Sequence, residues 1–265
     1  MQTKQSDGCR ACREDVADAL SFTMAFQPIV DMESGQIYAY EALVRGLDGG
    51  GAASVLSQLT DSNRYSFDQA CRVKAISLAS RLGLQGFLSI NFLPNAVYQP
   101  AACLRKTVEA AAEYDFPMHR LIFEVTENEQ VRNPDHLKSI FQEYKRRGMI
   151  TAIDDFGAGH SGLNLLAEFQ PDIIKLDMAL TRAIHSDRVR CAIVRSMVTL
   201  CRDLGISIIA EGIEQVEEAI ALRELGIRLF QGYCFARPET EALPTINDGS
   251  VQAVRTAFAG MQLSE

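Results

Sequence analysis

Residues 21–45 read SFTMAFQPIVDMESGQIYAYEALVR and contain two runs that are rich in apolar and aromatic residues. Only the four residues MESG, 32–35, separate the run 21–31 from the run 36–45. A link this short joins two antiparallel strands, because a parallel pair needs a crossover of about a dozen residues or more. The sequence therefore predicts an antiparallel hairpin at the start of the folded region.

The rest of the chain alternates between helical and extended patterns. Apolar residues recur at helical spacing in five segments, at 64–83, 101–113, 135–147, 188–204 and 215–224. Short apolar runs lie between or beside them, at 87–91, 121–125, 149–153, 172–176, 206–210 and 227–230. Several predicted helices end in a glycine just before the next run, namely Gly83, Gly148, Gly205 and Gly226.

These runs and the hairpin together make eight predicted strands, six of them reached through a helical or crossover segment. Repeated β–α units in a chain of this length favour an α/β fold of the modified TIM (β/α)₈ barrel type, and a doubly wound open sheet is the alternative. The hairpin makes the first strand antiparallel to the rest. We expect an N-terminal extension at 1–20, one domain at 21–246 and a helical C-terminal tail at 247–265.

Composition and charge restrict the classes of function. The 265 residues are 47% hydrophobic and carry a net charge of −8, which disfavours binding to long nucleic acid or to an anionic membrane. No run approaches the ~18 apolar residues of a spanning helix, so membrane insertion is not expected. Seven cysteines fit free thiols in a reducing cytoplasm. Cys9 and Cys12 form a CxxC without a second pair, and we expect no zinc or redox role for them.

Polar residues stand at the C-terminal ends of the predicted strands, where barrel enzymes have their active sites. The second to eighth strands supply Glu41, Asn91, Glu124, Asp154 with Asp155, Lys175 with Asp177, Glu211, and Gln231. A single residue of this kind would indicate a strand cap or a turn. Seven consecutive strands that supply such residues to one rim indicate a functional site.

The acids at this rim predict a site for divalent cations. Two carboxylates about 4 Å apart repel by roughly 4 kcal/mol at an effective dielectric constant near 20, so the cluster needs protons or cations. Carboxylate and amide oxygens suit Mg²⁺ or Mn²⁺, and the four histidines lie away from the strand ends, which argues against zinc. In a regular strand Asp154 and Asp155 would face opposite ways. Both can reach the cluster only if the strand frays at its end, and we expect this here.

Two divalent ions suit the in-line attack of water on a phosphodiester. Lys175 could hold the attacking water, Glu211 could accept its proton, and Arg45 could bind a phosphate through its planar fork. The alternatives are that Lys175 only pairs with Asp177 and that Arg45 is a surface charge.

These motifs resemble those of the EAL domains, named for the tripeptide found here as Glu41-Ala42-Leu43. EAL domains are bacterial phosphodiesterases that cut cyclic di-GMP to the linear dinucleotide pGpG. The pieces FQPIVD, EALVR, SINF, FEVTEN, AIDDFGAG, IIKLD, AEGIE and QGYCFARP occur in the family's order between Phe22 and Pro238.

The resemblance implies a role for each site residue and names the cofactors. It implies one metal ion on Glu41, Asn91, Glu124 and Asp154, and a second on Asp154 and Asp155. It implies that Lys175 and Glu211 serve the water, that Glu214 stabilises the loop after Asp155, and that the substrate contacts Gln27, Leu43, Arg45, Asp177, Gln231 and Pro238. Two Mg²⁺ or Mn²⁺ ions are expected, with Ca²⁺ not supporting hydrolysis, together with a homodimer that forms near the loop after Asp155.

One segment departs from the family pattern. Where members usually read DFGTGYSS, this chain reads DFGAGHSG, with Ala158, His160 and Gly162. The metal-binding aspartates are kept, so the change concerns the packing of the loop, and His160 is interpreted as a substitution for an aromatic residue.

Two other functions compete with catalysis. A receptor that binds cyclic di-GMP without cutting it usually lacks metal- or water-handling residues, and a protein-interaction module usually lacks Gln27, Arg45 or the QGY segment. All of these residues are present here. No sensor, phosphoacceptor or cyclase domain is readable, so the domain stands alone or is a piece of a longer chain with a regulatory partner.

Overall fold

The computed structural model describes residues 21–97, 99–126, 134–159 and 162–262, and the expectations for Cys9, Cys12 and His160 lie outside these ranges. β1 (Phe22–Asp31) and β2 (Gln36–Gly46) form the predicted antiparallel hairpin. Six further strands follow as parallel neighbours in chain order: β3 (Phe87–Asn91), β4 (Leu121–Thr126), β5 (Ile150–Phe156), β6 (Ile173–Leu176), β7 (Ser207–Ala210) and β8 (Leu229–Phe230).

β1 closes the sheet into a barrel. It pairs antiparallel with β2 along one edge and with β8 at Val30 and Asp31 along the other. A short strand, β9 (Glu239–Thr240), pairs with the same edge of β1 at Ala25 and Phe26. The predicted modified TIM barrel with an antiparallel first strand is therefore confirmed, and the open-sheet alternative is wrong because β2 and β8 are both paired with β1.

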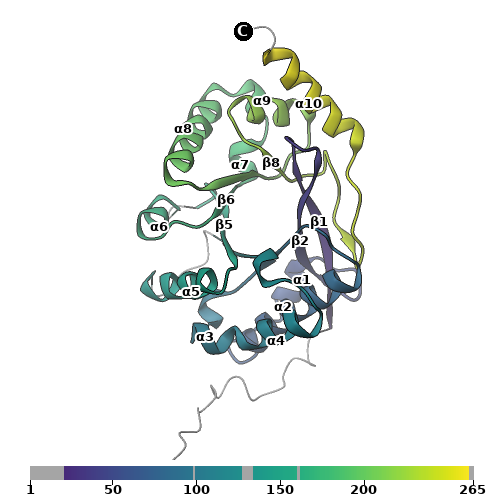
Figure 1. Cartoon of the computed structure of the whole chain (residues 1–265), viewed down its shortest axis with the longest axis vertical. Helices are drawn as coiled ribbons and strands as arrows, with labels where there is room; N and C mark the ends of the chain where they lie inside the picture. The colour runs from purple at the N-terminus through teal and green to yellow at the C-terminus, as the bar shows by residue number, and fades with distance from the viewer. Residues whose placement is uncertain (1–20, 98, 127–133, 160–161, 263–265) are drawn as a thin grey trace, which may run out of the picture.

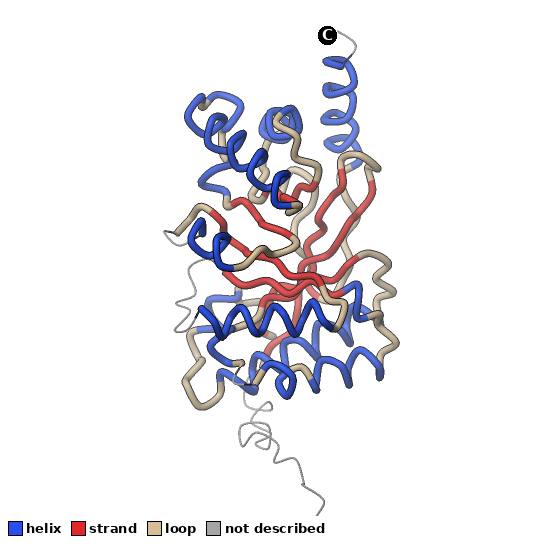
Figure 2. The backbone as a smooth tube through the Cα atoms, turned by 60° about the vertical axis from the view of Figure 1, so that its left-hand side comes forward, coloured by secondary structure: helices blue, strands red, loops and turns tan. Residues whose placement is uncertain are grey.

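Helices surround the strands, which occupy the centre of the molecule (Figures 1 and 2). The longer ones are α2 (Arg64–Arg81), α4 (Arg105–Glu113), α5 (Pro134–Arg146), α8 (Arg188–Leu204), α9 (Val216–Glu224) and α10 (Asp248–Gln262). The shorter ones are α1 (Ala52–Leu56), α3 (Pro100–Cys103), α6 (Gly162–Glu168) and α7 (Met178–Thr181). The sequence pattern did not reveal α1, α6 or α7, because such short helices show too few turns for a helical period.

Two hydrophobic clusters hold the barrel together. The larger cluster packs the strands against the helices. The smaller cluster draws one residue from each of seven strands: Ile29, Ala39, Ile122, Ala152, Ile173, Ile209 and Leu229. Alternate residues of a strand face the same side, so this cluster is an apolar layer inside the barrel, of the kind that TIM barrels build. The next inward position on each strand lies directly above it.

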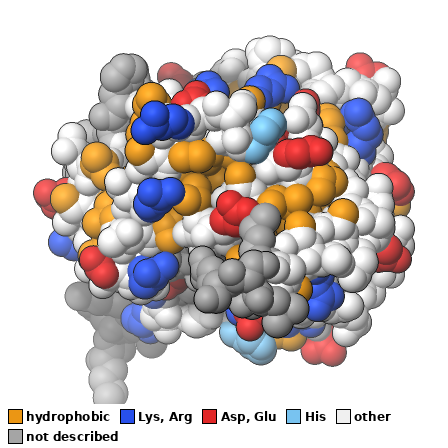
Figure 3. Space-filling view, turned by 90° about the horizontal axis from the view of Figure 1, so that it is seen from above, with side chains coloured by type: hydrophobic (Ala, Val, Ile, Leu, Met, Phe, Trp, Pro, Cys, Tyr) orange, Lys and Arg blue, Asp and Glu red, His pale blue; other side chains and the backbone are white. Residues whose placement is uncertain are grey.

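The surface carries both signs of charge. On the face drawn in Figure 3, Lys and Arg side chains are interspersed with Asp and Glu, and hydrophobic side chains gather between them. Among the described residues, no helix has both the length and the apolar character that crossing a membrane requires.

Candidate active site

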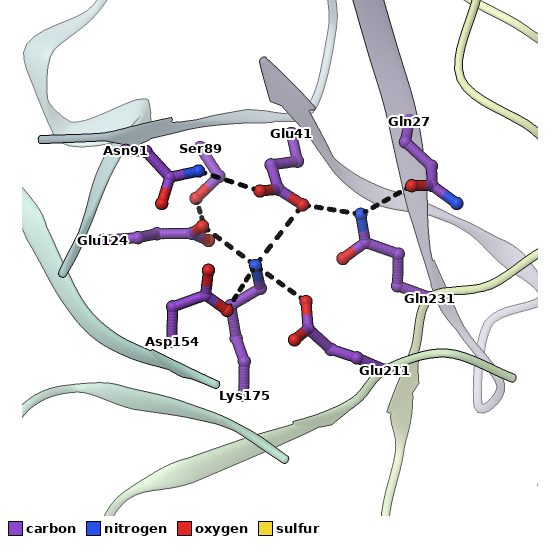
Figure 4. Close-up of polar contacts among 9 residues, drawn as sticks. All are labelled: Gln27, Glu41, Ser89, Asn91, Glu124, Asp154, Lys175, Glu211 and Gln231. Carbon is purple, nitrogen blue, oxygen red and sulfur yellow. Dashed lines mark hydrogen bonds and ion pairs between the residues drawn. The ribbon is translucent and has the colours of Figure 1, made fainter. Parts of the chain in front are cut away.

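The site is built from one inward position on each barrel strand (Figure 4). Phe87 of β3 packs against the apolar layer as well. The residues two positions beyond the layer are Glu41, Ser89, Glu124, Asp154, Lys175, Glu211 and Gln231. β1 runs in the opposite direction, so its member, Gln27, stands two residues before Ile29 and pairs with Glu41 across the hairpin. Strand alternation thus brings the strand-end residues predicted from the sequence into one cluster.

Lys175 lies at the centre of this cluster and is fully buried. Its Nζ atom lies 2.7 Å from Glu211 Oε1, 2.9 Å from Glu124 Oε2, 3.0 Å from Asp154 Oδ1 and 3.3 Å from Glu41 Oε2. Asp177 instead accepts a hydrogen bond from the Ala179 N–H at 2.8 Å and caps α7. The alternative in which Lys175 only pairs with Asp177 is therefore wrong.

One ammonium group cannot balance the carboxylates around it, and their pKa values show the imbalance. Burial raises the pKa of Glu124 to about 8 against the opposing effect of Lys175. Burial and then Asp154 raise the pKa of Asp155 to about 6. Burial also raises the pKa of Glu211 well above its usual value, although Lys175 lowers it. Without added cations, the cluster holds protons at neutral pH.

A β-bulge turns both neighbouring acids toward the cluster. Between Ile153 and Phe156, β5 takes three steps while its partner β6 takes two, from Ile174 to Leu176. The extra residue is accommodated at Asp155, whose φ of +53° lies in the left-handed region. The frayed strand end expected from the sequence is wrong, because β5 continues through both acids to Phe156.

The oxygen atoms fit divalent cations. Ligand atoms of Glu41, Glu124 and Asp154 lie within 4.8 Å of one another, and so do those of Asp154, Asp155 and Glu211. Asp154 is common to both groups, and its buried Oδ1 has no contact with hydrogen-bond geometry within the described part of the chain besides its ion pair with Lys175. All of these ligands are carboxylate oxygens, which suit Mg²⁺, Mn²⁺ or Ca²⁺.

Amide side chains orient Glu41 from both sides. Asn91 Nδ2 donates to Glu41 Oε1 at 2.9 Å, and Gln231 Nε2 donates to Glu41 Oε2 at 2.8 Å. Gln231 Nε2 also lies 3.4 Å from Gln27 Oε1, and Gln27 Nε2 donates to the Ala236 carbonyl at 3.2 Å. The predicted residues Asn91, Gln231 and Gln27 thus lie in one hydrogen-bonded chain with Glu41.

Strand-end reasoning missed Ser89. Its buried hydroxyl donates a hydrogen bond to Glu124 Oε1. On β3 it shares the inward face with Asn91, which lies two residues later and is the last polar residue of the strand. Counting back by two from Asn91 would have identified it.

Most of the other predicted residues line one of two cavities. The first, of about 320 Å³, is lined by Gln27, Asp155, Asp177, Glu211, Glu214 and Tyr233, among others. The second, of about 260 Å³, is mainly apolar and includes Leu43 and Asn91. Arg45 donates to the Val44 carbonyl at 2.7 Å and, like Pro238, lines neither cavity. Glu214 forms an exposed ion pair with Arg182 at 3.1 Å.

Comparisons with known proteins agree on one family. The EAL domain model matches residues 11–238. A standalone EAL protein from Vibrio cholerae O395, solved in a c-di-GMP-bound form, is 53% identical with a TM-score of 0.85, over 87% of this chain and 98% of its own. BlrP1 from Klebsiella pneumoniae, in a manganese and cy-diGMP complex, is 35% identical with a TM-score of 0.81, over 91% of this chain and 66% of its own.

Two curated relatives differ in their described roles. The blue light- and temperature-regulated antirepressor BluF of Escherichia coli is 34% identical over 92% of this chain and 59% of its own length. The cyclic di-GMP phosphodiesterase RocR of Pseudomonas aeruginosa is 35% identical over 61% of this chain and 41% of its own length. The chain therefore spans about three fifths or less of the length of these relatives.

Proposed function

The chain belongs to the EAL domain family, and from that premise we propose that it is a metal-dependent phosphodiesterase that hydrolyses cyclic di-GMP to linear pGpG. The observation that carries the proposal is the pair of acidic groups that share Asp154. A module that only bound a protein partner would have no need to hold buried, mutually repelling carboxylates around one lysine.

Each acidic group has a distinct part in the proposed site. Glu41, Glu124 and Asp154, with Asn91 beside them, would hold one Mg²⁺ or Mn²⁺ ion, and Asp154 and Asp155 would hold the second, near Glu211. Two such ions, when bound, lower the pKa of a water molecule and neutralise the charge of the phosphate. Lys175 holds the attacking water in place, and Glu211 accepts its proton.

The substrate would lie along the two cavities. Gln27, Asp177 and Gln231 present polar groups to the larger cavity, where they can pair with the edges of a base or with a ribose. Leu43 offers an apolar contact in the second cavity. We assign a phosphate contact to Arg45, contact with the far end of the substrate to Pro238, and support of the loop after Asp155 to Glu214. We also propose a homodimer.

A second candidate is a cyclic di-GMP receptor that does not cleave its ligand. The similarity to BluF, whose name describes an antirepressor, supports a role without catalysis. The intact set of metal- and water-handling side chains around Lys175 favours the enzyme.

The deciding experiment is incubation of the purified chain with cyclic di-GMP and Mg²⁺, with products resolved by chromatography. We expect pGpG to form, and we expect EDTA to abolish it. Glu211→Gln keeps the shape of the side chain but removes the proton acceptor, and should lower turnover by about two orders of magnitude or more. Tight binding of cyclic di-GMP in calorimetry, with no product after prolonged incubation, would identify a receptor instead.

A further inference from the structure

A buried carboxylate joins the two loops that follow β6 and β7. Glu218, in the first turn of α9, is 2% exposed. Its Oε2 accepts the N–H groups of Glu214 and Gln215 at 3.0 Å each, at the start of its own helix. Its Oε1 accepts the N–H of Ala183 at 2.8 Å, 35 positions earlier in the chain. One side chain thus cross-links two separate loops.

The contact with Ala183 fixes an unfavourable backbone conformation. Ala183 has φ +53° and ψ +23°, in the left-handed region that residues with a Cβ atom rarely adopt. A hydrogen bond from its N–H to a buried carboxylate is charge-assisted and therefore strong. This bond holds the chain in that conformation two residues after the end of α7.

α7 is also attached directly to the catalytic strand. Thr181, at the end of α7, is fully buried, and its Oγ1 donates to the carbonyl oxygen of Glu211 at 2.6 Å. Glu211 carries one of the carboxylates of the second acidic group, together with Asp154 and Asp155. The position of α7 therefore bears on the position of Glu211.

Close packing on both sides leaves α7 little freedom. A Cβ atom on Gly212, next to Glu211, would lie 2.5 Å from Met178 Cβ. A Cβ atom on Gly157, two residues after Asp155, would lie 2.4 Å from Leu180 Cδ1. α7 is thus wedged between the loop that follows Asp155 and the loop that follows Glu211.

We propose that Glu218 is a positioning residue for the second metal group. Through Ala183 and α7 it keeps Glu211 beside Asp154 and Asp155, although Glu218 itself contacts none of them. The inference rests on the metal-dependent function proposed above. The competing explanation is that Glu218 serves only as half of the capping box of α9, whose other half is Gln215.

Gln215 provides the matched control, because its side chain accepts the Glu218 N–H and makes the other half of the same cap. Mn²⁺ would be titrated into the metal-free full chain by calorimetry. We expect Glu218→Ala to lower the affinity for one of the two ions about ten- to a hundredfold, as loss of the residues that support metal ligands generally does. We expect Gln215→Ala to lower the melting temperature while it keeps the affinity for both ions.

Thr181 allows a rescue experiment. Thr181→Val keeps the shape but removes the hydrogen bond to Glu211, whereas Thr181→Ser keeps the hydroxyl. We expect Thr181→Val to lower the affinity for the same ion. It should also lower kcat for cyclic di-GMP about tenfold, with KM nearly unchanged. Thr181→Ser should restore both values.

The outcomes separate this inference from the proposed function. Equal Mn²⁺ affinities in Glu218→Ala, Gln215→Ala and the parent protein would overturn the positioning role, whether or not the parent cleaves cyclic di-GMP. Weakened binding of one ion in Glu218→Ala and Thr181→Val, in a parent that cleaves nothing, would support the positioning role and contradict the phosphodiesterase.

Discussion

Lys175 supplies the positive charge at the centre of the buried cluster, within 3.3 Å of four carboxylates. Carboxylates raise its pKa against the opposing effect of burial, beginning with Asp154 and Glu124. It therefore stays protonated, and it stabilises the folded chain before any metal ion binds. The role in handling the water that we propose for it and its role in stability are separable by experiment.

We predict that Lys175→Met destabilises the metal-free protein by about 3–5 kcal/mol, as removal of one partner from a buried ion pair generally does. Methionine keeps most of the volume, so the loss reflects charge rather than a cavity. Urea unfolding in EDTA would measure it, and excess Mn²⁺ should recover part of the loss by neutralising the same carboxylates. Equal unfolding free energies for variant and parent in EDTA would contradict the assigned role.

At the scale of single elements, the bulge in β5 shows how a local backbone feature serves the site. Its extra residue, Asp155, is held at a φ of +53° within a strand that otherwise pairs regularly with β6. The short pairing of β1 with β8 is a second local feature on which the fold depends. It joins only Val30 and Asp31 to Phe230 and Leu229, and it closes the barrel.

The bulge predicts an order of stabilities at position 155. Asp155→Gly and Asp155→Ala both remove the carboxylate, so both should abolish turnover. Glycine adopts a positive φ without strain, whereas alanine does not, so Asp155→Gly should be more stable than Asp155→Ala by about 1 kcal/mol. Urea unfolding in EDTA compares the two. Equal stabilities would mean that the backbone has relaxed out of the bulge.

The closure of the barrel predicts a dependence of stability on pH. Burial would raise the pKa of Asp31, but paired hydrogen bonds from Arg228, at 2.6 Å each, bring it from 3.8 to about 2. A lowered folded-state pKa stabilises the protein above pH 4, and this stabilisation is lost as the pH falls toward 2. We expect about 1–2 kcal/mol at neutral pH, less than the full shift implies because Arg228 is half exposed.

Arg228→Met should remove this stabilisation and flatten the pH profile between pH 5 and pH 2. The matched control is Arg146→Met, which breaks an exposed pair with Glu143 inside α5. The pKa of Glu143 is also lowered to about 2, chiefly by Arg146, but solvent screens the exposed Arg146, and Arg147 still pairs with Glu143 at 2.6 Å after the substitution. A parent-like profile in Arg228→Met, or an equal effect in Arg146→Met, would contradict the role of Asp31 in closure.

At the scale of the whole molecule, the ions should act as ligands of the folded state. A ligand at a hundred times its Kd stabilises a fold by about 2.7 kcal/mol. We expect Mg²⁺, Mn²⁺ and Ca²⁺ all to raise the Tm, because each suits carboxylate oxygens. Only Mg²⁺ and Mn²⁺ should support hydrolysis, since the looser coordination of Ca²⁺ misplaces the water. Full turnover in EDTA, or a requirement for Zn²⁺, would contradict the metal assignment.

The sequence by itself determined the order of the elements and most of the site. The four-residue link at 32–35 imposed the hairpin, and the period of two along each strand placed Glu41, Glu124 and Glu211 on one inward face. Both signals are local, because link length and strand alternation act over a few residues. They were therefore readable without knowledge of any partner strand.

Tertiary structure alone decided the features that depend on how separate strands and loops meet. The bulge at Asp155 is defined by the pairing of β5 with β6. The hydrogen bond of Ser89 requires Glu124 on the next strand, and that of Glu218 requires Ala183 on another loop. α7 is too short to show a helical period, and it is held by its neighbours. Register, packing and buried hydrogen bonds are long-range properties, since each depends on residues that come together only when the barrel closes.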